Sequence, residues 1–213
     1  MGLKERRIKQ KDDLRQKILD AARDMFAYEG YEQFSMRRIA SMIDYSPTTI
    51  YLYFKDKDEL LYTLCEETFG ELFQQTSDLR QAEKDPLRLL RSVMLNYIEF
   101  GLASPNHYKV AYFIKPAVYG TLEELQRNDT MGRRSYNAFR EIVEACVAGQ
   151  RFRNVDADMA TQVLWAAAHG LTSLLISHTD FPWADRTALA EMMVDIQIKG
   201  LLSQSESNTG VLP

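Results

Sequence analysis

Residues 35–61 read SMRRIASMIDYSPTTIYLYFKDKDELL, and the interpretation of the whole chain begins with them. Ser35 is a preferred N-cap residue, so it predicts a short helix over MRRIASMI. Asp44 tolerates a left-handed backbone and suits a tight turn after that helix. Ser46 and Pro47 then signal a second helix start, because proline is favoured at the first helical position. This second helix is expected to end near Phe54.

A longer helix precedes this pair. Its apolar residues recur at spacings of three and four, as on one helix face, and Gly30 follows them as a helix stop. These residues are Leu14, Ile18, Ala21, Ala22, Met25 and Phe26. Three helices, of which the last two are short and separated by a tight break, fit the helix-turn-helix description. Ile50 and Phe54, four residues apart, are expected to point into a core with Phe26 and Ile39.

The distribution of charge favours a nucleic-acid partner for this segment, although the formal net charge of the chain is −4. Residues 1–57 hold 12 basic and 9 acidic side chains, whereas the remainder holds 14 and 21. A basic module joined to an acidic remainder is typical of a small nucleic-acid-binding domain attached to another domain. A solvated basic helix would give the same pattern, so charge alone leaves both interpretations open.

The rest of the chain also predicts helices and no strands. Asp85-Pro86 and Ser104-Pro105 are helix starts, an amphipathic stretch covers about 121–148, and two further helices begin after Asp156 and Asp185. We therefore expect an all-α chain with three parts. Residues 1–56 form a helix-turn-helix domain with a basic N-terminal arm, 57–203 form a helical effector-binding and dimerisation domain, and 204–213 form a disordered tail.

Residues 35–61 resemble the DNA-binding signature of the TetR-type (tetracycline-repressor-like) transcriptional regulators, in register and without a gap. The likeness extends upstream to about residue 14. The matching features are Ser35, the Ile39-Ala40 pair, Ser46, Thr49, the run Tyr51-x-Tyr53-Phe54, and Lys57 followed by an acidic residue and Leu60. The resemblance implies a helix-turn-helix head on a helical-bundle sensor. The implied activity is that of a sequence-specific repressor released from a palindromic operator by a small effector.

The resemblance also implies roles for individual residues. Phosphate contacts are expected from Ser35, from Tyr51 or Tyr53, and from Lys57, while Ser46 opens the recognition helix. Base edges are expected near Arg37, Thr48 and Thr49. Ser35 is a helix cap under either interpretation, and Arg38 is expected to be solvated or turned to the DNA backbone. Ile43, Asp44 and Thr48 depart from the usual pattern of the family, which bears on the operator sequence.

Aromatic residues of the second domain suggest a pocket for a small, largely apolar effector. The candidates are Tyr97, Phe100, Tyr108, Phe113, Tyr136, Trp165 and His169. Each of them could equally be an ordinary core residue. Trp165-x-x-x-His169-Gly170 resembles a feature of one subgroup of TetR-type C-terminal domains. A histidine bonded to a neighbouring carbonyl, with glycine allowing close helix approach, is the alternative.

The last two helices are expected to form a homodimer. One apolar stripe consists of Leu164, Ala168, Leu171 and Leu175, and a second of Leu189, Met193, Ile196 and Gly200. The three histidines lack the spacing of a helical metal pair, so neither a metal nor a cofactor is expected. We expect no enzyme activity, no membrane partner and a cytoplasmic location. A ligand-independent or activating DNA-binding protein is the alternative function, and an enzyme is the less favoured one.

Overall fold

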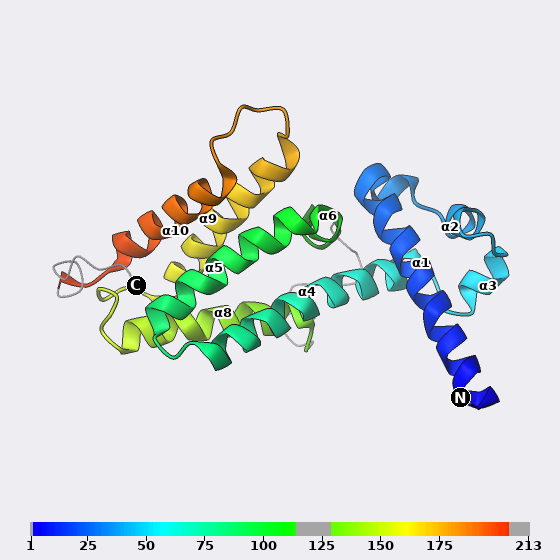
Figure 1. Ribbon diagram of the computed structural model, residues 1–213, viewed down its shortest axis with the longest axis horizontal. Coiled ribbons are helices and arrows are strands. Elements are labelled where there is room, and N and C mark those ends of the chain that lie inside the picture. Colours follow the sequence, from blue (N-terminus) through cyan, green and yellow to red (C-terminus); the bar gives the residue numbers. More distant parts are fainter. Residues whose placement is uncertain (1, 114–128, 205–213) are drawn as a thin grey trace. The chain divides into compact units, whose positions relative to one another are not determined.

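Helices occupy most of residues 2–113 and 129–204, which are the residues that the computed structural model describes (Figure 1). The helices are α1 (Leu3–Gln33), α2 (Met36–Met42), α3 (Pro47–Tyr51), α4 (Lys57–Ala82), α5 (Pro86–Ala103), α6 (Pro105–Phe113), α8 (Met131–Ala148), α9 (Ala157–Ser177) and α10 (Arg186–Leu201). An isolated bridge joins Phe152 and Leu202, and the described residues contain no strand. The predicted all-α class is confirmed.

Three of the helix starts read from the sequence in this part of the chain are side-chain caps, whereas α6 begins at Pro105 as predicted without a cap bond from Ser104. The Asp85 side chain accepts hydrogen bonds from the amides of Leu87 and Arg88 at the start of α5. Asp156 caps α9 and Asp185 caps α10 in the same way. Each cap satisfies amides that have no partner within the helix, which explains why these local signals locate helix starts well.

The chain divides into two compact units. The head comprises residues 1–68 and 106–130, and the bundle comprises 69–105 and 131–213. Helix α4 runs without a break through residues 68 and 69, so it contributes residues to both units. The predicted boundary at residues 56 and 57 coincides with the start of α4 and stays a prediction. The predicted helix start near residue 121 and residues 205–213 of the predicted tail lie outside the described residues.

The head is built around the inner face of α1, which packs on α2, while α2 packs on α3. Ile18, Phe26, Ile39, Ile50 and Phe54 are all almost completely buried, so the predicted core of the helix-turn-helix is confirmed. Helix α1 is interrupted where the sequence predicts a stop, because Gly30 has φ +78° and ψ 172°. That left-handed φ is accessible to glycine and costly for other residues.

The bundle has α5 at its centre. Helices α8, α9 and α10 all pack against α5, and α9 also packs against α8 and α10. Leu164, Ala168 and Leu175 of α9 are buried in the core of their own chain, and Leu171 packs against it. The expectation that this α9 stripe forms a dimer interface is therefore wrong. Periodicity identified an apolar face correctly, but the covering partner is α5 and its neighbours.

Each unit contains one buried cysteine. Cys65 lies in the head, and its thiol donates to the carbonyl oxygen of Val110 at 3.8 Å. Cys146 lies in the bundle core, where burial raises the pKa of its thiol to about 12. Both are free cysteines.

Helix α9 is also long and apolar enough to cross a membrane, judged by length and composition alone. Its buried residues lie in the core of the bundle, and the core helix of a folded domain has the same composition. The expectation of no membrane partner stays a prediction.

Candidate nucleic-acid interface and effector site

Two hydroxyl caps shape the α2–α3 pair. Ser35 Oγ accepts from the amide of Arg38 at 3.2 Å and starts α2. Asp44 has φ +60° in the turn, as its position predicts. Ser46 Oγ accepts from the amide of Thr49 at 3.1 Å and lies 2.8 Å from Thr49 Oγ1. Helix α3 ends at Tyr51, earlier than expected, although the Phe54 amide still donates to the Ile50 carbonyl oxygen.

Arg37 and Arg38 are both exposed, but only Arg38 makes ion pairs and hydrogen bonds within the described part of the chain. The Arg38 guanidinium pairs with both carboxylate oxygens of Glu29 and also donates to the carbonyl oxygen of Gln33. In the described part of the chain, Arg37 has no hydrogen-bond or ion-pair partner. A side chain that is solvated and unpaired keeps its donors available for an acceptor outside the protein.

The outer face of α3 is a surface of hydroxyls and exposed apolar groups. Thr48 is exposed, Tyr51 is 53% exposed, and Thr49 and Tyr53 are half-buried. The two tyrosines therefore differ in environment, as their spacing of two predicts. Leu52 is 77% exposed, and the sequence analysis did not select it as a site residue. Its position four residues after Thr48, on the same helix face, was the signal that could have identified it.

Lys57 is positioned by an aromatic ring at the start of α4. Its Nζ lies 3.8 Å from the centroid of the Tyr31 ring, a distance that indicates a cation–π contact. The Tyr31 hydroxyl donates to Asp58, and burial together with that hydrogen bond raises the pKa of Tyr31 to about 12. Asp56 caps α4 by accepting from the Glu59 amide at 2.9 Å. Tyr31 is thus a positioning residue that local sequence reasoning did not assign.

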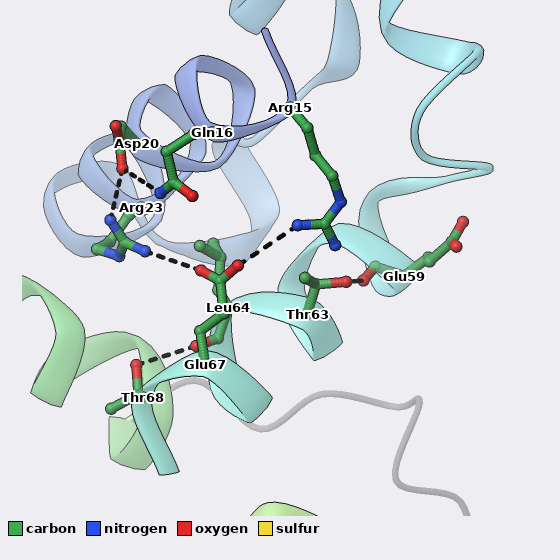
Figure 2. Close-up of polar contacts among 9 residues, drawn as sticks. All are labelled: Arg15, Gln16, Asp20, Arg23, Glu59, Thr63, Leu64, Glu67 and Thr68. Atoms are coloured by element: carbon green, nitrogen blue, oxygen red, sulfur yellow. Dashed lines mark hydrogen bonds and ion pairs between the residues drawn. The ribbon is translucent and has the colours of Figure 1, made fainter. Parts of the chain in front are cut away.

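An ion-pair network within the head joins α1 to α4 (Figure 2). Glu67 of α4 pairs with Arg23 at 3.2 Å and with Arg15 at 3.5 Å, and Arg23 also pairs with Asp20 at 2.9 Å. Burial raises the pKa of Glu67 above its usual range, and the two arginines oppose that effect. Because its partners lie 44 and 52 residues away, no sequence spacing could have indicated this network.

Four of the proposed effector residues come together in the bundle. The Tyr97 hydroxyl lies 3.1 Å from His169 Nδ1, and Ser173 Oγ lies 3.4 Å from His169 Nε2. The Trp165 ring is 6.0 Å from the Tyr136 ring and 6.0 Å from the His169 ring, measured between centroids. We call Tyr97, Tyr136, Trp165 and His169 the aromatic cluster. Burial lowers the pKa of His169, which favours the neutral imidazole.

The other effector candidates have different surroundings. Phe100 lies on α5 of the bundle and is buried. Tyr108 and Phe113 belong to α6 in the head, where the fully buried Tyr108 ring lies 4.7 Å from the Tyr112 ring and 6.0 Å from the Phe113 ring. The prediction of one set of seven residues thus spans two compact units, and their role in effector binding stays a prediction.

Two family models match the chain. One is described as bacterial regulatory proteins, tetR family, and matches residues 18–63; the other is described as the tetracyclin repressor-like C-terminal domain and matches residues 90–196. The chain belongs to the TetR family. It is therefore a DNA-binding transcription regulator and not an enzyme. Residues 18–63 include the whole α2–α3 pair and Lys57, so the resemblance read from the sequence is confirmed there.

Individual relatives of this TetR-family chain agree with that assignment. The fatty acid metabolism regulator protein of Bacillus subtilis is 24% identical over 199 residues, covering 91% of this chain and 98% of the relative. The solved structure of FadR from Bacillus subtilis, in complex with stearoyl-CoA, has a TM-score of 0.73 at 21% identity and covers 87% and 98% of the two chains. A tetR-family regulatory protein from Rhodococcus RHA1 has a TM-score of 0.75 at 20% identity, covering 89% and 98%. These structures share the fold.

No group of three or more histidine, cysteine or acidic side chains within residues 2–113 and 129–204 is arranged to hold a metal ion.

Proposed function

We propose that this TetR-family regulator is a cytoplasmic homodimeric repressor, released from a palindromic operator by a small, largely apolar effector. The observation that carries the proposal is the exposed face of α2 and α3. It combines an unpaired arginine, Arg37, with the exposed Thr48 and Leu52 on a rigidly capped helix pair. In helix-turn-helix proteins this is the face that enters the major groove.

The roles proposed for the head follow from these environments. Arg37 donates two hydrogen bonds to a guanine edge, which discriminates against the wrong base by about 1–3 kcal/mol. Thr48 and Thr49 lie near base edges, and Leu52 packs on a thymine methyl group. Phosphates are bound by Lys57, which Tyr31 holds in place, and by four hydroxyl groups of the head that are not assigned to base edges. These are Ser35, Ser46, Tyr51 and Tyr53.

The proposed effector site contains the aromatic cluster. A largely apolar site with a few polar groups suits a ligand with a hydrocarbon part and one hydrogen-bonding group. Tyr97 and His169 supply that polar pair, and Trp165 and Tyr136 supply apolar surface. Because a relative with the same fold was solved with stearoyl-CoA, acyl-CoA thioesters are the first effector class to test.

The proposed dimer uses an exposed apolar face of α9 and α10 that lies beside the buried stripe. On α9 the residues Val163, Gly170 and Leu174 recur at helical spacing; Val163 and Leu174 are exposed, and a Cβ at Gly170 would meet nothing within 4 Å. On α10, Met192 and Ile196 are exposed one turn apart. Apolar faces with small residues suit close helix packing, and a second copy of the chain would cover both helices symmetrically.

The proposed release mechanism uses α4. This helix begins with Lys57 in the head and ends in the bundle, so a shift of α4 on effector binding would displace a phosphate contact. To reverse occupancy of the operator, the effector must favour the DNA-incompetent state by several kcal/mol. A ligand that binds equally well to the free and the operator-bound dimer would contradict this mechanism.

The decisive experiment selects random duplex DNA on the purified protein at physiological salt. We expect enrichment of a palindrome with regularly spaced half-sites, bound with an affinity that falls steeply as salt rises. The retained duplex is then used as a probe, and acyl-CoA thioesters of increasing chain length are added. Displacement by long-chain thioesters, and none by coenzyme A alone, is expected.

Other outcomes separate the parts of the proposal. Enrichment of a site without two-fold symmetry would contradict the dimeric operator. A palindrome that no acyl chain displaces would keep the DNA assignment and remove the acyl effector. Tighter binding in the presence of a thioester would favour an activator or a co-repressor response.

A further inference from the structure

The first turns of α1 have no packing partner in the head. Every described side chain from Lys4 to Asp13 is exposed, and full burial begins only at Ile18. We call residues 4–13 the overhang. At a rise of 1.5 Å per residue it spans about 15 Å of helix. In Figure 1 this dark-blue end of α1 continues beyond α3.

The overhang is rich in cations that do not serve the stability of the helix. Cations near a helix N-terminus oppose the helix dipole, and a short helix without tertiary packing is only marginally stable. Across the described ranges, no salt bridge is made by any of its five cations. They are Lys4, Arg6, Arg7, Lys9 and Lys11. Their number and position are better explained by an anionic partner than by folding.

Three of these cations share one side of α1. Lys4, Arg7 and Lys11 are spaced by three and four residues, which places them in a row along the helix. Arg15 continues the row, and its guanidinium carbon lies 5.2 Å from the centroid of the Phe54 ring, just after α3. Arg15 also pairs with Glu67 of α4 at 3.5 Å, so the row runs on the side of α1 that faces the junction between α3 and α4.

The same side of the overhang carries an exposed apolar residue. Ile8 follows Lys4 by four residues and is 55% exposed. An apolar group between cations suits a surface that presents both phosphates and sugars, as the DNA backbone does. Arg6 and Lys9 lie on the opposite side of the helix.

We propose that Lys4, Arg7 and Lys11 bind the DNA backbone outside the segment that α3 enters, so that the overhang is a second DNA-contacting surface. This inference rests on the proposed operator binding by the head. The partner is double-stranded DNA, because its phosphates supply one negative charge per about 1.7 Å of axis, dense enough to meet three cations along about 10 Å of helix. The contact depends on the backbone and carries no base preference.

The test uses two double variants of identical composition. Arg7→Gln/Lys11→Gln removes charge from the row, and Arg6→Gln/Lys9→Gln removes the same charge from the opposite side. Glutamine has a helix propensity close to that of lysine and arginine, and far-ultraviolet circular dichroism checks that helicity is unchanged. Binding is measured between 50 and 200 mM salt on a long duplex and on one trimmed to the half-sites.

We expect the slope of log affinity against log salt to fall by about 1.8 for the row variant on the long duplex, from about 0.9 for each lost phosphate contact. The affinity lost between 50 and 200 mM salt would then be about tenfold smaller than in the wild type. The opposite-side variant is expected to keep the wild-type slope on the long duplex. On the trimmed duplex, the row variant and the wild type are expected to have similar slopes. Equal changes in both double variants, or no change on the long duplex, would overturn the proposal.

Failure of the operator assignment gives a different result. If the wild type binds every duplex alike but the row variant still loses slope, the overhang contact stands and the operator does not. If the wild type binds its operator specifically and the row variant keeps the wild-type slope, the operator assignment stands and the overhang contact does not.

Discussion

Glu29 decides how the two neighbouring arginines of α2 differ. It engages the guanidinium of Arg38 through both carboxylate oxygens, while Arg37 has no partner among the residues that the structure describes. The charge on the two side chains is the same, so their surroundings assign different roles to them. Arg37 is available to DNA, and Arg38 ties the end of α1 to the start of α2.

Substitution of each arginine by alanine should separate these roles. Arg37→Ala is expected to weaken binding to the selected operator by about 1–3 kcal/mol while leaving binding to unrelated DNA almost unchanged. Arg38→Ala is expected to lower the thermal midpoint of the head and to preserve the ratio of specific to non-specific affinity. Fluorescence anisotropy with both duplexes measures that ratio. A loss of specificity in Arg38→Ala alone would reverse the assignment.

His169 should make the stability of the bundle dependent on pH. Burial lowers its pKa below the ordinary value of 6.5, so the unfolded chain binds a proton more readily than the folded one. The free energy of unfolding therefore falls as pH drops through 6.5 towards the lower folded pKa, and the loss is complete below that value. Thermal unfolding of the wild type and of His169→Gln, compared from pH 5 to 8, should show a larger loss of stability at low pH in the wild type than in the variant.

At the scale of elements, the ion-pair network between α1 and α4 fixes two helices whose sequence positions are far apart. Arg23 has only 11% of its side chain exposed, so its guanidinium depends on carboxylate partners. Glu67 is more exposed and bears a burial cost of its own, since desolvation raises its pKa. The contribution of this network to the stability of the head is the gain from the Arg23 and Arg15 ion pairs minus the cost of burying Glu67.

Glu67→Gln is expected to destabilise the head by about 1–3 kcal/mol, because a buried guanidinium loses a charged hydrogen-bond partner. Glu71→Gln, at an exposed position of α4, removes the same charge and serves as the control. Chemical denaturation followed in the head measures the difference. Equal stability of the two variants would mean that the burial cost of Glu67 cancels its ion pairs.

The elements show why some features could be predicted from the sequence and others could not. Ser35, Ser46, Asp85 and Asp156 act through amides two or three residues away, so their caps are local and were predicted. The Tyr31–Asp58 and Arg23–Glu67 contacts depend on chain folding, and nothing local indicates them. Periodicity showed that α9 has an apolar face, but not whether its own chain or a second copy covers that face. This is why the α9 stripe chosen for the interface was wrong, while a dimer through the last two helices stays a prediction.

At the scale of the whole molecule, Gly170 tests the proposed dimer. Its Cβ position is open within the chain, and alanine is more favourable than glycine in a helix by about 1 kcal/mol. Gly170→Ala should therefore not destabilise an isolated chain. If a partner helix packs closely there, the added methyl group should raise the dimer dissociation constant at least about tenfold, which corresponds to 1.4 kcal/mol.

Sedimentation equilibrium measures this dissociation constant, and Asn137→Ala at an exposed position of α8 provides a matched helix substitution. An unchanged dissociation constant in Gly170→Ala would place the interface elsewhere. A Val163→Asp variant that still forms a stable dimer would also argue against an interface on this face of α9.

Because each unit contains one buried thiol, the rate at which a reagent modifies each cysteine reports how often that unit opens. A thiol reagent can modify Cys65 only when the head opens, and Cys146 only when the bundle opens. Operator DNA should slow modification of Cys65, and an effector should slow modification of Cys146. If effector binding in the bundle loosens the head, the effector will also speed the modification of Cys65. The ratio of the two modification rates in one sample would then measure the coupling between the two units.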